Sequence, residues 1–164
     1  MKRAQIDAFC GCRETLYQRI VFFAAPAILL AGIVYVAVRY AQLPAEIPSH
    51  YNFYGEIDGY GSRGTLWITP VIGILCDALM LAVSFFPQTW NVGTSVTVFN
   101  RALVYRRVRD LIADIRLSTA VMFTAIAVWQ TAIAPTFPWG MGVLIGVCCT
   151  APLVRFFVRL AMKK

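Results

Sequence analysis

The sequence has 164 residues, of which 59% are hydrophobic and only 14% are charged, and its formal net charge is +7. Soluble domains are about half apolar and about a quarter charged. This composition therefore excludes an ordinary soluble globular domain and indicates an integral membrane protein. The length leaves no room for a second soluble domain beside the apolar segments described next, so residues 1–164 are predicted to form one transmembrane domain.

Four apolar segments are long enough to cross a bilayer, which takes roughly 20 mostly apolar residues in a helix. The uncharged run 117–154 is about twice that length, and a proline-rich stretch at 135–140 divides it into two spans. We therefore predict an all-α membrane protein with four transmembrane helices arranged as two hairpins. The predicted spans are residues 20–40, 65–86, 117–134 and 139–160.

Positive charge is concentrated on one predicted side of the membrane. Only Arg39 and Arg63 fall on the other side. Because positive residues stay cytoplasmic, both termini should lie in the cytoplasm and the loop 41–64 outside it, in a bacterial inner membrane. The basic face should contact anionic membrane lipids, and nucleic-acid binding is not expected. The 13 basic residues on the cytoplasmic side are Lys2, Arg3, Arg13, Arg19, Arg101, Arg106, Arg107, Arg109, Arg116, Arg155, Arg159, Lys163 and Lys164.

The connection 87–116 is predicted to be a basic cytoplasmic segment. Its first part is polar and rich in turn residues, and from Asn100 onward apolar residues recur at helical spacing. Such a basic amphipathic helix typically lies flat at the inner membrane surface. The alternative is a docking surface for a cytoplasmic protein partner. The arginines expected at this lipid or partner surface are Arg101, Arg106, Arg107 and Arg109.

The cysteines do not indicate a disulfide or metal framework. Cys10 and Cys12 are separated by one residue, whereas zinc knuckles use a spacing of at least two, and no second pair of ligands follows. We therefore expect two reduced thiols in the cytoplasm, with metal binding as the alternative.

The loop 41–64 holds the densest group of polar residues, including His50, the sole histidine of the sequence. Alternation predicts a short extended segment over 48–55, with His50, Asn52 and Tyr54 on one face and Tyr51 and Phe53 on the other. The loop should fold onto the membrane surface, because amphipathic rings favour the head-group layer. The rings in question are Tyr40, Tyr51, Phe53, Tyr54, Tyr60 and Trp67.

Two interpretations of the loop's polar residues remain open. A divalent metal would use His50 with Glu46 or Asp58, but one histidine with oxygen donors makes a poor and unselective site. The favoured interpretation is structural: His50, Asn52 and Asp58 satisfy backbone groups and hold the loop in one shape. No metal and no cofactor are therefore expected.

Inside the membrane, three polar residues need an explanation: Asp77, Gln130 and Arg155. We expect Asp77 and Arg155 to form a structural clamp, because their depths differ by only a few ångströms, and Gln130 to join an interhelical hydrogen bond. The rival interpretation is a proton- or cation-coupled transport site centred on Asp77. Four helices enclose little room for a pathway, so a transporter of this size would work as a homo-oligomer.

The spacing LP-x-x-IP-x-H-x-N-x-x-G-x-x-D in the loop resembles the signature of a bacterial membrane family of unknown function. The same domain forms the N-terminal part of the SdpI immunity and signalling proteins. Arg63 stands where the family usually has a lysine, about five positions after the aspartate. The matching residues, expected to bind a ligand or organise the loop, are Leu43, Pro44, Ile47, Pro48, His50, Asn52, Gly55 and Asp58.

The resemblance implies an SdpI-like sensor or immunity component whose outer loop recognises a peptide or envelope ligand. No motif of a hydrolase, a phosphate-binding loop or a zinc enzyme is present, so an enzymatic activity is not expected. The alternative function is the small oligomeric transporter described above. The two differ in where the indispensable residues lie: in the outer loop for a sensor, and within the membrane for a transporter.

Overall fold

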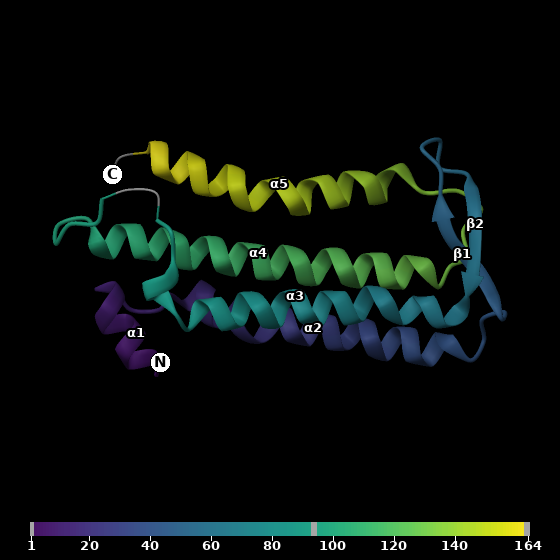
Figure 1. Cartoon of the computed structure of the whole chain (residues 1–164), viewed down its shortest axis with the longest axis horizontal. Coiled ribbons are helices and arrows are strands. Elements are labelled where there is room, and N and C mark those ends of the chain that lie inside the picture. Colours follow the sequence, from purple (N-terminus) through teal and green to yellow (C-terminus); the bar gives the residue numbers. More distant parts are fainter. Residues whose placement is uncertain (1, 93–94, 163–164) are drawn as a thin grey trace.

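The structure is a computed structural model that describes residues 2–92 and 95–162. Four long helices run side by side, both termini lie at one end, and a small β-hairpin lies at the other end (Figure 1). We call these the basic end and the hairpin end. Lys163 and Lys164, counted with the basic residues above, lie outside the described residues. The helices are α1 (Arg3–Cys10), α2 (Leu16–Tyr40), α3 (Ile68–Ser84), α4 (Arg101–Gln130) and α5 (Trp139–Ala161).

The shorter elements lie in the connections. Strands β1 (Glu46–Tyr51) and β2 (Ile57–Ser62) pair antiparallel between α2 and α3. The 3₁₀ helix η1 (Arg63–Trp67) continues directly into α3, and η2 (Pro87–Thr89) follows that helix. The short extended segment predicted in the loop is half of a two-stranded hairpin, and the second strand was not predicted. The pairing of the two strands satisfies backbone groups that an open loop would leave to water.

The prediction of four helices with the length and apolarity of membrane spans is confirmed. In the described part of the chain, four helices are long and apolar enough to cross a bilayer. The predicted connector helix from Asn100 and the predicted span 117–134 belong to the same element, because α4 runs without a break from Arg101 to Gln130. It is one continuous helix of 30 residues, about 45 Å long. The sequence from Arg101 to Gln130 contains no glycine or proline, so nothing separates the connector helix from the span.

Helix α4 is the centre of the bundle. It contacts α2, α3 and α5, and both α2 and α3 pack against it more extensively than against each other. Glycines allow the close approach: a Cβ on Gly32 would lie 2.9 Å from Thr124 Cγ2, and one on Gly73 would lie 2.9 Å from Phe123 Cβ. Helices α2, α3 and α5 thus pack around α4. The arrangement of the spans as two hairpins stays a prediction.

Candidate functional site

The β-hairpin is anchored to the helices by its apolar signature residues. Leu43 and Ile47 are 6% and 2% exposed and pack in one buried cluster with side chains from α2, η1 and α4. Pro44 is exposed and Pro48 is half-buried. Leu43 and Ile47 therefore attach the hairpin to the bundle and are not available to a ligand. Their partners in the cluster are Val36, Leu66 and Ala127.

Arg63 fastens the base of the hairpin. Its Nη1 donates to the carbonyl of Leu43 over 3.2 Å, and its guanidinium lies 4.9 Å from the centre of the Tyr40 ring. The backbone N–H of Arg63 also donates to the carbonyl of Ala45 over 2.9 Å. Arg63 thus joins the start and the end of the loop, and its charge is turned toward the end of α2.

The turn of the hairpin is organised by Asn52 and Gly55. The Asn52 Oδ1 accepts from the backbone N–H of Tyr54 at 2.9 Å and of Glu56 at 3.0 Å, and its Nδ2 donates to Glu56 Oε2 at 3.0 Å. Gly55 has φ +81°, a left-handed conformation that glycine adopts without strain. These two signature residues therefore determine the shape of the turn.

The predicted alternation of faces was wrong beyond Tyr51. Strand β1 ends at this residue, and the turn projects Phe53 and Tyr54 together, with 97% and 82% exposure. Their rings pack edge to face, with centroids 5.9 Å apart. The bonds from Asn52 close the chain into a turn, which removes the strand geometry on which the alternation depended.

His50 and Asp58 link the two strands. Nδ1 of His50 lies 2.6 Å from Oδ1 of Asp58, and the side chains are 73% and 42% exposed. Glu46 pairs with Ser62 at the opposite end of the strands, so the three residues weighed as metal ligands are not brought together. In the residues that the structure describes, no group of three or more potential ligands is found.

The tip of the hairpin packs against the connection between α4 and α5. The Tyr51 hydroxyl donates to the carbonyl of Ala134 over 2.9 Å, and burial raises the pKa of this phenol. The backbone N–H of Phe137 donates to the carbonyl of Gly55 over 2.8 Å, and the rings of Tyr51, Trp129 and Phe137 pack together. The sequence did not indicate this contact, because the two segments lie more than 80 residues apart.

A groove with a volume of about 430 Å³ lies where these two segments meet. Residues 49–55 form one side, and Phe137, Trp139 and Gly142 form the other. Trp139 is 87% exposed at its edge, beside the protruding rings of the turn. The signature therefore has two parts: buried residues that hold the hairpin, and exposed residues that line an aromatic groove.

The intramembrane clamp uses a different partner from the one predicted. Asp77 of α3 binds Arg116 of α4 through two bonds, Nε to Oδ1 at 2.8 Å and Nη2 to Oδ2 at 3.1 Å. Both side chains are buried, with 7% and 4% exposure. The pairing of Asp77 with Arg155 was wrong because Arg116 was placed at the end of a span, whereas α4 extends well beyond it. Arg155 binds Asp114 instead.

Charged residues of α4 connect it to every other helix over two turns. Arg109 Nη2 lies 2.6 Å from Asp7 Oδ1 in α1, and Asp110 accepts from Gln18 Nε2 of α2 at 2.7 Å and from Arg159 Nη1 of α5 at 2.5 Å. Asp114 accepts from Tyr17 of α2 and from Arg155. With Arg116 bound to α3, α4 is held to all four of its helical neighbours by polar contacts.

The arginines expected at a lipid or partner surface divide into two kinds. Arg109 is 12% exposed and also donates to the carbonyl of Cys12 at 3.0 Å, so its assignment to an outer surface was wrong. The guanidinium of Arg101 lies 5.0 Å from the centre of the Phe9 ring, and Arg107 Nη2 donates to the carbonyl of Met162 at 3.1 Å. Arg106 is exposed.

Gln130 lies near the hairpin end, where its Oε1 accepts from Thr69 Oγ1 of α3 at 2.9 Å. At the basic end, Cys10 and Cys12 are free thiols with 0% and 8% exposure, and burial raises the pKa of Cys10 to about 11. They pack with Ile6 and Tyr105, which attaches α1 to α4.

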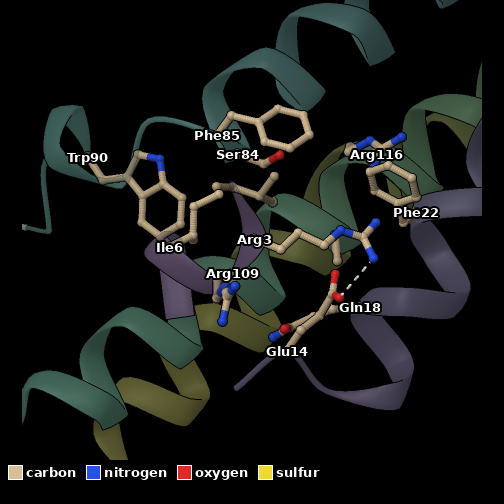
Figure 2. A pocket seen from close by; sticks show the side chains of 12 residues that line it. Arg3, Ile6, Glu14, Gln18, Phe22, Ser84, Phe85, Trp90, Arg109 and Arg116 are labelled. Atoms are coloured by element: carbon tan, nitrogen blue, oxygen red, sulfur yellow. Dashed lines mark ion pairs between the residues drawn. The ribbon is translucent and has the colours of Figure 1, made fainter. Parts of the chain in front are cut away.

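A small polar cavity of about 70 Å³ lies between α1, α2, α3 and α4 (Figure 2). Arg3 and Glu14 form an ion pair of 3.4 Å on its wall. Arg109 and Arg116 also line it, each bonded to an aspartate as described above. Because its charged groups are paired, the cavity offers little free charge to a ligand.

Comparisons with known proteins relate the hairpin to a family of unknown function. Residues 27–74 match the family model described as a domain of unknown function, DUF1648. The match covers the second half of α2, the hairpin, η1 and the start of α3. A protein of Archaeoglobus fulgidus, described as an uncharacterized protein, is 24% identical over 145 residues, which cover 79% of each chain. No solved structure matches.

The helices and the site define a class, that of multi-pass membrane proteins. Within this class, residues 27–74 are similar to the domain of unknown function. These residues include the whole β-hairpin.

Proposed function

We propose that this protein is a non-enzymatic membrane sensor or immunity component, similar to SdpI, whose hairpin recognises a peptide or envelope ligand outside the cytoplasm. The groove at the hairpin tip carries this proposal. It has a volume of about 430 Å³, within the range of about 300–1,000 Å³ typical of ligand pockets. The hydrogen bonds of Asn52 and the docking of Tyr51 hold it in a defined shape.

The exposed rings support recognition of an amphipathic ligand. Phe53, Tyr54 and Trp139 are each more than four-fifths exposed, and large aromatic side chains supply much of the energy at recognition surfaces. His50 and Asn52, which line the groove, bring polar groups to the same surface. The combination suits a segment with apolar side chains and free backbone hydrogen-bonding groups, such as a peptide.

The distribution of charge supports an orientation with the hairpin outside. Thirteen of the 15 basic residues fall in the three sequence segments predicted to be cytoplasmic, because positively charged segments stay in the cytoplasm. The proposed location is therefore a bacterial inner membrane, with the groove facing an extracellular or periplasmic ligand.

The experiment compares two aromatic replacements in cells that depend on the protein for tolerance of an extracellular toxic peptide. Phe53→Ala with Tyr54→Ala removes two rings that line the groove. Tyr60→Ala removes a ring that is 67% exposed on β2 and does not line it. We expect the first variant to lose tolerance and the second to retain it, at equal amounts of protein in the membrane. Equal tolerance in both variants would contradict the proposal.

A second candidate function is a small oligomeric transporter coupled to protons or cations. The observation that favours it is the position of Arg116, which lines the polar cavity while binding Asp77 (Figure 2). Transport would require this ion pair to open during each cycle. Purified protein in vesicles distinguishes the two functions, because only the transporter predicts a proton or cation flux that Asp77→Asn abolishes.

A further inference from the structure

The seam between α4 and α5 has a charged part and an apolar part in line with each other. On α4, Asp110, Asp114 and Ser118 follow one another at intervals of four, so they lie on one face. On α5, Arg159 binds Asp110 and Arg155 binds Asp114. The charged part of the seam therefore lies at the basic end and leads directly to Ser118.

The apolar part is a groove of about 200 Å³. Along α4 it extends from Ile115, the residue after Asp114, to Met122, a length of about 10 Å. Half the hydrocarbon thickness of a bilayer is about 15 Å, so the length of the groove is about two-thirds of the thickness of one leaflet. Its walls are mainly apolar, and they include Ile115, Thr119, Cys148, Cys149, Pro152 and Leu153.

We propose that this seam binds one anionic phospholipid, with an acyl chain in the groove and the phosphate on Arg155 and Arg159. The orientation of the lipid follows from the structure, because the groove runs from the two arginines toward the hairpin end. A lipid of the leaflet at the basic end has the same direction, with its phosphate at the surface and its chain toward the bilayer centre. The inference does not depend on the function proposed for the hairpin.

Arg155 and Arg159 have free N–H donors that could bind a phosphate. Their side chains are 39% and 38% exposed, and each binds its aspartate through Nη1. A guanidinium carries five N–H donors in a planar fork that suits phosphate oxygens, so one bond to a carboxylate leaves donors for a second acceptor.

The surrounding charge favours an anionic lipid over a zwitterionic one. Arg107 reaches the carbonyl of Met162 at the end of α5, which places a third guanidinium beside the seam. Three arginines thus face two aspartates here, and the local charge is positive. Basic pockets between helices on the cytoplasmic side are known to hold anionic head groups.

The test measures thermal unfolding of delipidated protein in mild detergent after three additions at equal concentration. These are dioleoyl phosphatidylglycerol, dioleoyl phosphatidylcholine with the same chains, and glycerol phosphate without chains. We expect phosphatidylglycerol alone to raise the melting temperature by several degrees, because a ligand bound to the folded state stabilises it. Native mass spectrometry should show one retained lipid. An equal rise with phosphatidylcholine would overturn the role of the arginines, and a rise with glycerol phosphate would identify a site for free phosphate.

Three variants locate the site. Arg159→Gln removes one phosphate ligand, and Cys149→Phe fills the groove without changing charge. Arg106→Gln is the matched control, since it removes an exposed arginine of α4 outside these contacts. We expect the first two to lose the lipid-dependent rise and the control to keep it. A control that loses as much as Arg159→Gln, or a Cys149→Phe variant that keeps the full rise, would overturn the proposal. If Arg159→Gln does not fold, Cys149→Phe decides alone.

Discussion

Arg116 of α4 and Asp77 of α3 form a two-point ion pair that is almost wholly buried between the helices. The two bonds measure 2.8 and 3.1 Å, and the side chains are 4% and 7% exposed. Asp77 lies seven residues from the end of α3, about 10 Å along the axis, within an otherwise uncharged helix. Each buried charge is therefore tolerated inside the helix bundle because its partner carries the opposite charge.

The first prediction concerns this pair. Asp77→Asn leaves Arg116 buried without a counter-ion, so the melting temperature in detergent should fall markedly, by an amount equivalent to about 3–5 kcal/mol. Adding Arg116→Gln should recover part of the loss, because two neutral side chains can hydrogen-bond to each other. Differential scanning fluorimetry provides the measurement.

Arg155→Gln is the control for this cycle, since Arg155 binds Asp114. It should not rescue Asp77→Asn, and the effects of the two changes should add. Rescue by Arg155→Gln but not by Arg116→Gln would contradict the pairing seen here.

The second prediction concerns the turn of the hairpin. Gly55 has φ +81°, so Gly55→Ala forces an ordinary residue into a left-handed conformation, at a cost of about 1–2 kcal/mol. Its Cβ would also approach the carbonyl oxygen of Phe137 to 3.3 Å. Hydrogen exchange should accelerate in residues 52–57, while the helices keep their protection. Gly64→Ala serves as the control, because its Cβ would lie 3.6 Å from the nearest atom, Ser62 Oγ. Equal exchange in both variants would show that the turn does not depend on Gly55.

Much of the helical architecture follows from the sequence, because long uncharged segments must cross the bilayer as helices. The burial of residues 101–116 inside the bundle did not follow. Seven of the 16 residues from Arg101 to Arg116 are charged, and a charged side chain considered alone is expected to face water. In the structure, Arg109 and Arg116 are instead paired with acids from α1 and α3, and the pairing allows the helix to remain buried.

The candidate site was predictable in part. The spacing of the loop signature pointed to its residues, and Asn52 and Gly55 have the conformational roles typical of a tight turn. The other wall of the groove was not predictable, because Phe137 of the α4–α5 connection and Trp139 at the start of α5 belong to no polar motif. Its contact with Tyr51 and Gly55 is a long-range packing event that leaves no local pattern in the sequence.

The third prediction concerns Cys10. Its thiol is fully buried, and burial raises its pKa from 9.0 to about 11, so at pH 8 the reactive thiolate is about 100-fold rarer than for an ordinary cysteine. In a variant that keeps Cys10 as its sole cysteine, maleimide labelling should be slow until the protein is unfolded. A cysteine placed at the exposed Ser95 should label at once under the same conditions. Rapid labelling of Cys10 would show that α1 is not packed as described.

The raised pKa of Cys10 also makes the stability of the protein depend on pH. Because the folded protein holds the Cys10 proton more tightly than the unfolded chain, this group contributes its full stability below pH 9. The contribution should decline as the pH rises from 9 toward 11. Cys10→Ser should therefore show a smaller loss of melting temperature over that interval than the parent protein. An identical loss in both would exclude Cys10 as a source of alkaline instability.

The fourth prediction concerns metal binding at the hairpin. His50 pairs with Asp58, and Glu46 lies at the opposite end of the strands. Two ligands make a weak site for zinc, which usually takes at least three from the protein. Added zinc should leave the melting temperature unchanged in the parent and in His50→Ala. A rise of several degrees that requires both His50 and Asp58 would establish a metal site instead of a structural pair.

The last prediction concerns orientation. Ser49 is exposed beside the groove, and Thr89 is exposed in η2 at the basic end, so a cysteine at either position is accessible to a water-soluble reagent on its own side. Because basic segments remain cytoplasmic, an impermeant maleimide should label Ser49→Cys in intact cells and should label Thr89→Cys only after the cells are opened. Both variants are made in a background without native cysteines. The reverse pattern would place the hairpin in the cytoplasm, and the proposed recognition of an extracytoplasmic ligand would then fail.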